Sequence, residues 1–460
     1  MGWQKLVHVC RRWRAVVFAS RHRLDLRLLC TYRTPVRKIL DCWPPLPIII
    51  RYGERVEHAG LQLPSPDDED NIIVALENRD RVCEVELAVG PALFARLMRV
   101  MQKPFPLLES LVLRVRNTSL ALPNAFLGGF APRLCDVYLD AITPPALPMF
   151  LSSAMDLVHL QLVQLPRNPY TSSEALVAAL SAMTRLKILR INFADLSSPP
   201  PYPTTVPSSL VRRVVLPALF YLEFQGTSEY LEDFAARIDG TPSLGRAYVS
   251  FFDQQTMFEI PHFAQLVARA DMQRALSEAQ MLPSRDRIYI SLCGPRDGRR
   301  GERAAAPGGP PGPPPSMEEW FRLQVSCAQS SRQVPLMARI LRQISSLLSC
   351  VRKLEILTSI LTPQTRGDVV GATEWLGLFL PFGGVEVLHV AHGSVPDVAR
   401  ALRDVAGERA AEVLPALREL RFDWFASRWE EAVASFISAR QLSGHLPIAF
   451  SRLNKTLPLP

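Results

Sequence analysis

The feature that most constrains the fold of this chain is a six-residue apolar pattern that recurs along it. Written as apolar-x-x-apolar-x-apolar, we identify the pattern at nine places: LESLVL (108–113), LCDVYL (134–139), LVHLQL (157–162), LKILRI (186–191), LFYLEF (219–224), LGRAYV (244–249), VRKLEI (351–356), VEVLHV (385–390) and LRELRF (417–422). Alternate residues of a strand point to opposite faces of a sheet, so the last two apolar residues of each hexamer share one face. The hexamers therefore predict short strands that are buried on one face only.

The spacing of the hexamers is that of a repeat. The last apolar positions of the first six hexamers are 26, 23, 29, 33 and 25 residues apart. Amphipathic helix patterns lie between several of them: PALFARLMRVM begins with Pro91, and SEYLEDFAARI opens on Ser228. A third, TSSEALVAALSAM, has the capping-box spacing from Thr171 to Glu174. A strand, a loop and a helix repeated with this period resemble a leucine-rich repeat.

We therefore expect an α/β fold, an irregular leucine-rich-repeat solenoid with parallel strands on its concave face and helices on its convex face. The alternative is an ordinary doubly wound α/β domain, which does not require nine matches to one template.

The pattern departs from that of leucine-rich repeats in one respect. Leucine-rich repeats commonly place Asn or Cys three residues after the last strand apolar, where this chain has Arg116, Ile142, Leu165 and Ala194. The turns are therefore irregular, and the repeat boundaries stay open.

Proline and glycine divide the chain further. Forty prolines would break any long helix that they entered, so the elements should be short. The segment RDGRRGERAAAPGGPPGPPP (296–315) combines basic residues with a Pro/Gly tract, which predicts a disordered insertion. Its flanks, RIYISLCG (287–294) and WFRLQVSC (320–327), both alternate like strands, and we expect them to pair as a hairpin.

The first twenty residues predict an amphipathic helix. At 100° per residue, one stripe collects Leu6, Val9, Cys10, Trp13, Val16 and Val17. His8, Arg11, Arg12 and Arg14 lie off that stripe, so the arginines should form the solvated face rather than an anion-binding site.

VCRRWRAVV followed by SRHRLDLRLL closely resembles the C-terminal half of an F-box, the helical module that binds the Skp1 adaptor of cullin-RING ubiquitin ligases. Residues 6–50 are similar to the form found in the expanded F-box families of mushroom-forming fungi, where an irregular leucine-rich-repeat array follows. The chain starts after the helix, roughly Leu-Pro-x-Glu-x-Leu-x-x-Ile-Phe, with which F-boxes usually open. The resemblance implies a Skp1-binding face made by Leu6, Val9, Cys10, Trp13 and Val17. The alternative is that this helix only caps the first repeat.

These interpretations predict the following organisation. Residues 1–30 form a partial F-box, 31–80 a connector, 81–293 the first part of the array, 294–316 the disordered insertion, 317–450 the second part of the array, and 451–460 a tail.

If the array is a solenoid, the residues that alternate with the buried positions should line its concave face. The candidates for binding a target protein are Asp136, Tyr138, Asp140, His159, Gln161, Arg190, Asn192, Tyr221, Glu223, Tyr248, Glu355, His389, Arg421 and Asp423. Tyrosine, arginine and both signs of charge suit recognition of a protein surface. The alternative is that they are only the solvated side of each strand.

Motifs for catalysis are missing from the sequence. It has no GxGxxG or GxxxxGK[ST] for phosphates and no GxSxG elbow, so we expect neither an enzyme nor a cofactor. HVAH (389–392) has no carboxylate at zincin spacing, and PDDED (66–70) lacks the glycine of a calcium loop, so the first should bind no metal and the second should be a solvated loop. None of the eight cysteines forms CxxC or CxxH, so we interpret them as reduced core residues.

Charge and hydropathy narrow the partners and the compartment. A formal charge of +8, spread over 52 basic and 44 acidic residues, is too dilute to predict nucleic-acid binding, although binding through the basic segment 296–303 stays a third possibility. No signal-peptide layout and no apolar run of about 20 residues occurs, so we expect no membrane contact and a cytoplasmic or nuclear protein.

Together these features predict a non-catalytic adaptor of an SCF-type (Skp1-cullin-F-box) ubiquitin ligase that binds a target protein on the concave face. The alternative is a leucine-rich-repeat scaffold for protein interactions with no role in ubiquitin transfer.

Overall fold

We describe the chain from a computed structural model, which divides it into two compact units, Met1–Leu196 and Ser197–Pro460. The structure describes residues 3–20, 26–31, 34–53, 66–115, 118–144, 147–166, 172–194, 213–252, 258–270, 276–284, 286–295, 317–327, 329–357, 371–405, 410, 412–423, 429–445 and 447–453. The predicted insertion therefore lies outside the described residues, except for its first two residues, which end a strand.

The first unit is built on a run of parallel strands that follow one another in chain order. Their order is β1 (Leu28–Cys30), β2 (Ile48–Gly53), β3 (Val82–Val89), β4 (Ser110–Val115), β6 (Asp136–Asp140), β8 (His159–Leu165) and β9 (Ile188–Phe193). Each neighbouring pair is parallel. A parallel connection between adjacent strands needs a crossover segment, and short helices supply most of these crossovers.

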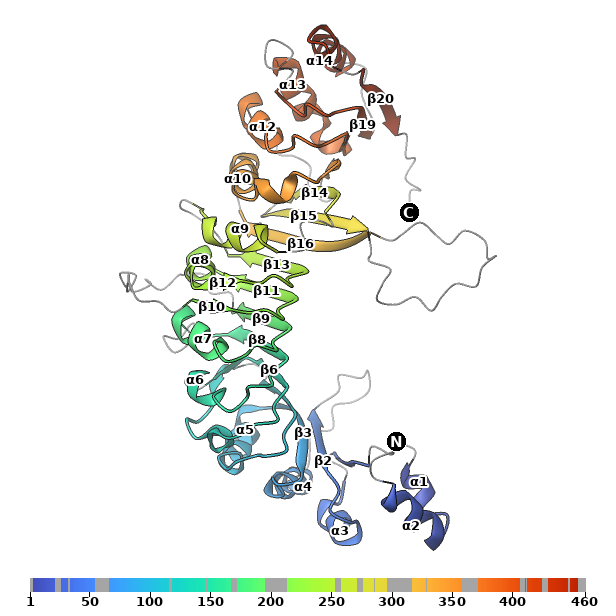
Figure 1. Cartoon of the computed structure of the whole chain (residues 1–460), viewed down its shortest axis with the longest axis vertical. Coiled ribbons are helices and arrows are strands. Elements are labelled where there is room, and N and C mark those ends of the chain that lie inside the picture. The colour runs from blue at the N-terminus through green and yellow to red at the C-terminus, as the bar shows by residue number, and fades with distance from the viewer. Residues whose placement is uncertain are drawn as a thin grey trace. The chain divides into compact units, whose positions relative to one another are not determined.

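The helices of this unit are α1 (Trp3–Val7), α2 (Arg11–Ala19), α3 (Val36–Cys42), α4 (Pro66–Glu77), α5 (Pro91–Val100), α6 (Leu147–Phe150) and α7 (Ser173–Leu180), with the 3-10 turn η1 (Phe126–Gly129). Figure 1 shows α5, α6 and α7 on one side of the strands. A small second sheet joins β5 (Leu120–Ala121) to β7 (Ile142–Thr143) in parallel.

The second unit repeats this plan with one interruption. Its strand order is β11 (Tyr221–Gly226), β13 (Arg246–Phe251), β16 (Met317–Ser326), β15 (Arg287–Pro295), β14 (Glu278–Pro283), β17 (Lys353–Ile356), β18 (Val387–Val390), β19 (Glu419–Asp423) and β20 (Ala449–Leu453). Strand β15 is antiparallel to both of its neighbours, and the other pairs are parallel. The predicted pairing of the strands that flank the insertion is thus confirmed.

The helices of the second unit are α8 (Ser228–Ala236), α9 (Pro261–Ala268), α10 (Ser330–Gln343), α11 (Ser345–Leu348), α12 (Ala372–Phe379), α13 (Val395–Val405) and α14 (Glu430–Leu442), with the 3-10 turn η5 (His392–Ser394). Strands β10 (Val214–Val215) and β12 (Ile238–Gly240) form a short parallel pair of their own. Figure 1 shows α8, α9, α10 and α12 on one side of the strands of this unit. The α/β class and the largely parallel sheet are therefore confirmed.

All nine hexamers contain a strand, and each strand begins two residues after its hexamer starts. The apolar residues of the hexamers are buried, as in β4, where Leu111 is 0% and Leu113 is 1% exposed. The first apolar residue of each hexamer closes a tight turn before the strand. Leu134 N–H, for example, donates to Ala131 O at 3.2 Å, and Leu417 N–H donates to Leu414 O at 2.9 Å. The accepting residue is itself buried, so each repeat has one more buried position than the hexamer.

Several strands were not predicted. β3 and β14 match the same template, as Val82, Val85 and Leu87 and as Leu276, Ala279 and Met281. β1 lies at the end of the predicted partial F-box and β2 lies within the predicted connector, and the two are parallel neighbours in the sheet. The sheet therefore begins before the first hexamer.

The predicted helix starts are confirmed for α5 at Pro91 and for α8 at Ser228. For α7 the capping residue is Ser172, whose hydroxyl accepts from Ala175 N–H at 3.2 Å, while Thr171 lies outside the described residues. The prediction of a solvated loop for PDDED was wrong, because these residues open α4. Proline and acidic residues in a first turn favour a helix start, and two of these acids pair with Arg96 of α5.

We predict that the two faces of a strand respond oppositely to truncation. Leu160→Ala in β8 removes a side chain that is 0% exposed and should lower the free energy of unfolding by about 2–5 kcal/mol. Its neighbour Gln161 points to the other face, so Gln161→Ala should change the free energy by about 0.5 kcal/mol or less. Urea unfolding followed by circular dichroism measures both, and equal losses would contradict the assignment of faces.

Candidate protein-binding surfaces

The N-terminal segment forms two helices instead of the single predicted one. α1 ends at Val7, and α2 begins at Arg11 with Cys10 as its cap, whose Sγ accepts from Trp13 N–H at 3.5 Å. Arg14 Nε donates to Val7 O at 3.1 Å, which holds the two helices at an angle that the helical projection did not include. The prediction of one continuous apolar stripe was therefore wrong.

The predicted Skp1 face is divided by this break. Val17 is buried at 2% exposure, and Leu6 is half-buried. Val9, Cys10 and Trp13 are exposed, and so is Val16, which the predicted face left out. The buried side of these helices carries Trp3, whose ring meets those of Phe18 and Trp43 edge-on at 6.3 and 5.5 Å.

The exposed apolar side chains have arginines beside them. Val9 is 63%, Trp13 49% and Val16 56% exposed. Arg11, Arg12 and Arg14 are exposed on the same helix, as predicted. We call Val9, Trp13 and Val16 the α2 patch. Trp13 and Val16 lie on α2, and Val9 lies in the turn just before it. An exposed aromatic side chain beside two exposed aliphatic ones is the kind of feature that marks a protein contact.

In the first unit, the predicted target-binding residues lie on the sheet face opposite the buried one. Asp136, Tyr138, Asp140, His159, Gln161, Arg190 and Asn192 are all half-buried and alternate with fully buried residues. The register places Asp136 beside His159, Tyr138 beside Gln161, and Gln161 beside Arg190. We call this surface the open face of the first unit.

The side chains of this open face contact one another both within a strand and across strands. Asp136 Oδ1 pairs with His159 Nδ1, and Tyr138 OH donates to Asp140 Oδ2 at 3.4 Å. The guanidinium of Arg114, which was not predicted, lies 4.7 Å from the ring centre of Tyr138. Burial raises the pKa of the Asp140 carboxyl above its usual range. Together β4, β6 and β8 border a shallow hollow of about 380 Å³.

In the second unit, tyrosines lie together with residues of the hairpin. The rings of Tyr221 and Tyr248 meet edge-on at 5.4 Å, and Tyr221 OH donates to Glu223 Oε2 at 2.6 Å. Arg322 of β16 lies 5.1 Å over the ring of Tyr248. Sequence reasoning missed Arg322, because none of the nine hexamers that we identified lies in β16. Only the pairing of β13 with β16 brings it beside Tyr248.

A second cluster of this unit crosses four adjacent strands, β14, β17, β18 and β19. His389 of β18 lies between Glu355 of β17 and Asp423 of β19, with Nδ1 3.6 Å from Glu355 Oε1 and Nε2 3.0 Å from Asp423 Oδ1. Lys353 Nζ lies 2.7 Å from the same Glu355 oxygen, and Gln280 Nε2 donates to Glu355 Oε2 at 3.0 Å. We call these five residues the His389 cluster.

Contact within the cluster shifts its proton equilibria. The contact with His389, aided by Lys353, lowers the pKa of Glu355 to about 2. The contact with Glu355 raises the pKa of His389, burial opposes this shift, and the bond to Asp423 adds to it. His389 is therefore protonated over a wider pH range than a free histidine.

The remaining predicted residue, Arg421, pairs with Glu419 of its own strand. Its Nε and Nη2 each lie 2.8 Å from one oxygen of that carboxylate.

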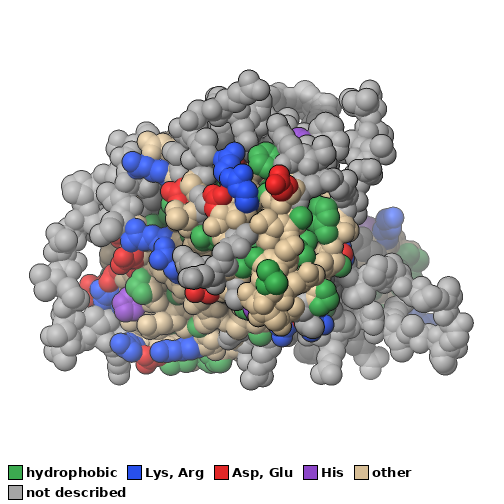
Figure 2. All heavy atoms as spheres, turned by 90° about the horizontal axis from the view of Figure 1, so that it is seen from above, with side chains coloured by type: hydrophobic (Ala, Val, Ile, Leu, Met, Phe, Trp, Pro, Cys, Tyr) green, Lys and Arg blue, Asp and Glu red, His purple; other side chains and the backbone are tan. Residues whose placement is uncertain are grey.

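Figure 2 shows the end of the molecule that is at the top of Figure 1, where acidic and basic side chains are interspersed among apolar ones. On the described surface of that end, the charges do not separate by sign.

The potential metal ligands and the cysteines of the described residues lie in several different surroundings. Within these ranges, no three His, Cys, Asp or Glu side chains are grouped so as to hold a metal ion. Burial raises the pKa of Cys30 and of Cys83 to about 11, so both remain thiols. Cys10, Cys42 and Cys350 are exposed, which corrects their interpretation as core residues. Every helix in the described part is too short or too polar to cross a lipid bilayer.

No protein-family model matches this chain, and no curated protein matches it either. The function proposed below therefore rests on the chemistry of these surfaces.

The His389 cluster should make stability depend on pH in a defined direction. A histidine with a raised pKa stabilises the fold below its unfolded value of 6.5, and the effect is lost as the pH rises through the folded value. Glu355 has a lowered pKa, so its ionised form stabilises the fold above its ordinary pKa of 4.5. This stabilisation is lost as the pH falls toward 2. We expect His389→Gln to cost about 1–3 kcal/mol near pH 5.5 and clearly less at pH 9.

Urea midpoints at pH 5.5, 7 and 9 would measure this difference. The matched control is His262→Gln, because the His262 side chain is exposed on α9. A loss for His389→Gln that is the same at all three pH values would show that the imidazole contributes by packing and not by charge.

Proposed function

We propose that this chain is a non-catalytic adaptor of an SCF-type ubiquitin ligase. In this proposal its strands form a leucine-rich-repeat solenoid whose open faces bind a target protein, and its N-terminal helices bind a Skp1 adaptor in the cytoplasm or nucleus. The observation that carries it is the alternation of burial, repeated in strand after strand, which leaves Tyr, Arg, Asp and Glu on one face of each unit.

The strand arrangement supports the solenoid. In the first unit the main-sheet strands are parallel and adjacent in chain order, and helices lie on one side of them. Each repeat then covers the apolar side of its neighbour, as stacked repeats require. The antiparallel hairpin of the second unit is an insertion in this plan, since β13 and β16 on one side and β14 and β17 on the other remain parallel.

The composition of the open faces supports a protein as the target. Binding energy at protein interfaces is concentrated in Tyr, Trp and Arg side chains. Tyr221, Tyr248 and Arg322 lie together, and Tyr138 lies with Arg114. Most of their polar atoms already have partners within the face. These side chains are thus held in place before a target arrives, which reduces the entropy lost on binding.

The α2 patch supports the adaptor side of the proposal. Val9, Trp13 and Val16 are exposed in the segment that resembles an F-box, and burying them against a partner would release ordered water. The adaptor itself would catalyse nothing. It would hold the target near a recruited conjugating enzyme, so the rate would rise through proximity.

One observation favours the alternative, a repeat scaffold without a ubiquitin role. The break between α1 and α2 buries Val17 and half-buries Leu6, so two of the five predicted Skp1-binding residues are withdrawn from the surface. The open faces would serve a scaffold equally well.

A binding experiment with a purified Skp1 adaptor separates the two. We expect a 1:1 complex by size-exclusion chromatography with light scattering, and we expect Trp13→Asp to weaken it at least about tenfold because it puts a charge in the contact. The matched control is Phe130→Asp, since Phe130 is also 49% exposed but lies outside the α2 patch. If the unsubstituted chain forms no complex, or if both variants weaken it equally, the adaptor role is excluded and the scaffold remains.

A further inference from the structure

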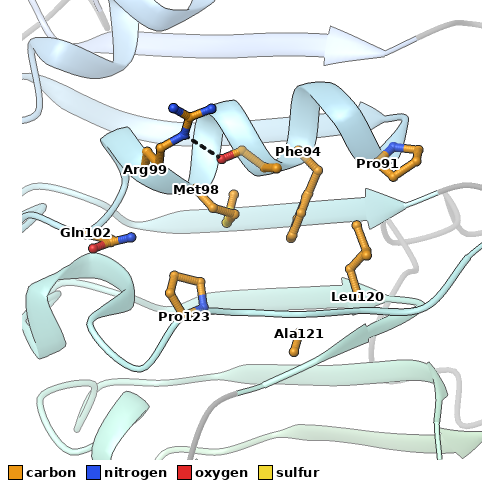
Figure 3. A pocket seen from close by; sticks show the side chains of 9 residues that line it. Pro91, Phe94, Met98, Arg99, Gln102, Leu120, Ala121 and Pro123 are labelled. Atoms are coloured by element: carbon orange, nitrogen blue, oxygen red, sulfur yellow. Dashed lines mark hydrogen bonds between the residues drawn. The ribbon is translucent and has the colours of Figure 1, made fainter.

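An apolar groove separates α5 from the short strand β5. Figure 3 shows Phe94 and Met98 pointing from α5 toward Leu120 and Pro123, with Ala121 beside them. The groove has a volume of about 290 Å³. Phe94 and Met98 are each 4% exposed, so they form its floor. This groove lies among the helices and loops and is not part of the open face.

One wall of the groove is a strand edge. Leu120 N–H donates to Ala141 O at 3.2 Å, and Leu122 N–H donates to Thr143 O at 2.9 Å, so both point toward β7. Backbone groups alternate along a strand, and the N–H and C=O of Ala121 between them therefore point the other way, toward α5. In the described part of the chain, β5 has no strand on that side. A free edge is where an extended peptide can add as a further strand.

The rim of the groove is positively charged. Arg99 lines it and is exposed, and Lys103, which is also exposed, lies in the turn that follows the end of α5. Arg99 Nε contacts only Ala95 O of its own helix, at 3.5 Å, and within the described residues no carboxylate pairs with either cation. Arg96, one turn before, differs because it pairs with Glu69 and Asp70. The groups on this rim that can pair with a partner are therefore cationic, and a partner with carboxylates would complement them.

We propose that this groove binds an extended peptide segment of a partner protein that carries a bulky apolar residue next to acidic ones. The segment pairs with the Ala121 edge of β5 and inserts its apolar side chain over Phe94 and Met98. Its carboxylates lie beside Arg99. This surface is separate from the α2 patch and the open faces, so it stands whether or not the chain is a ligase adaptor.

The test uses the full chain and a fluorescein-labelled peptide, Gly-Ser-Val-Leu-Val-Asp-Asp-amide, with fluorescence anisotropy as the readout. We expect saturable binding with Kd below about 100 µM. Ala95→Trp should weaken it at least about tenfold by filling the groove. Its control is Ala92→Trp, which makes the same change at an exposed position of α5 that does not line the groove. Circular dichroism checks that each variant is folded.

Charge exchange and backbone methylation test the other two contacts. Arg99→Glu should weaken the Asp-Asp peptide about tenfold and improve binding of a Lys-Lys version, whereas Arg133→Glu, an exposed site elsewhere, should do neither. We expect N-methylation to weaken binding at only one of two positions, the central Leu or the following Val, because consecutive backbone N–H groups of a strand point to opposite sides. Any of three results overturns the proposal. The first is that binding does not saturate at about 1 mM peptide. The second is that the Ala95→Trp and Ala92→Trp variants bind the peptide with the same Kd, and the third is that the Arg99→Glu variant binds the Asp-Asp and Lys-Lys peptides with the same Kd.

Discussion

The in-register pairing of parallel strands is the constraint on which the rest of this structure depends. Because side chains alternate along a strand, a shift of one residue would turn every buried Leu, Ile and Val of that strand outward. The pairs Leu111 with Val137, Val137 with Leu160, and Leu160 with Leu189 keep the apolar residues in rows. The buried turn before each strand adds a further row and fixes the point at which each strand starts.

The same register makes the open faces into networks. When apolar residues are in rows on one side, polar residues must be in rows on the other, about 5 Å apart across strands. Asp136 then meets His159, and His389 meets a carboxylate on each of its neighbours. Pairs of this kind neutralise much of the charge on each face, so recognition there would depend on shape and on aromatic and guanidinium groups more than on net charge. The groove beside α5 differs, since its cations are not paired within the described chain.

Much of the fold was predictable, and the failures have physical causes. The nine hexamers became strands because a period of two is a local property of the chain. The prediction of one continuous N-terminal helix was wrong because two contacts interrupt the helix: capping by Cys10 and the hydrogen bond from Arg14 to Val7. A helical projection includes neither contact. The prediction of a loop at PDDED was wrong because it considered only the charge of the segment. A proline followed by acidic residues also favours the start of a helix. Among the site residues, Arg114 and Arg322 were missed because each contacts a tyrosine ring on a neighbouring strand. Lys353 was missed although its partner Glu355 lies on the same strand.

The sequence by itself determined the strands, their buried faces, several helix starts and the types of residue that face outward, because each of these follows from local periodicity. Only the tertiary structure decided which strands are neighbours. It therefore also decided that the predicted hairpin lies between β13 and β14, and it alone brought together the His389 cluster and the groove between α5 and β5. It also decided the place of Arg440, which is 1% exposed and donates to carbonyl oxygens of Val413 and Leu414 at 2.7 and 3.0 Å. Contacts between residues far apart in the chain depend on register and crossover geometry, and no short window of sequence contains either.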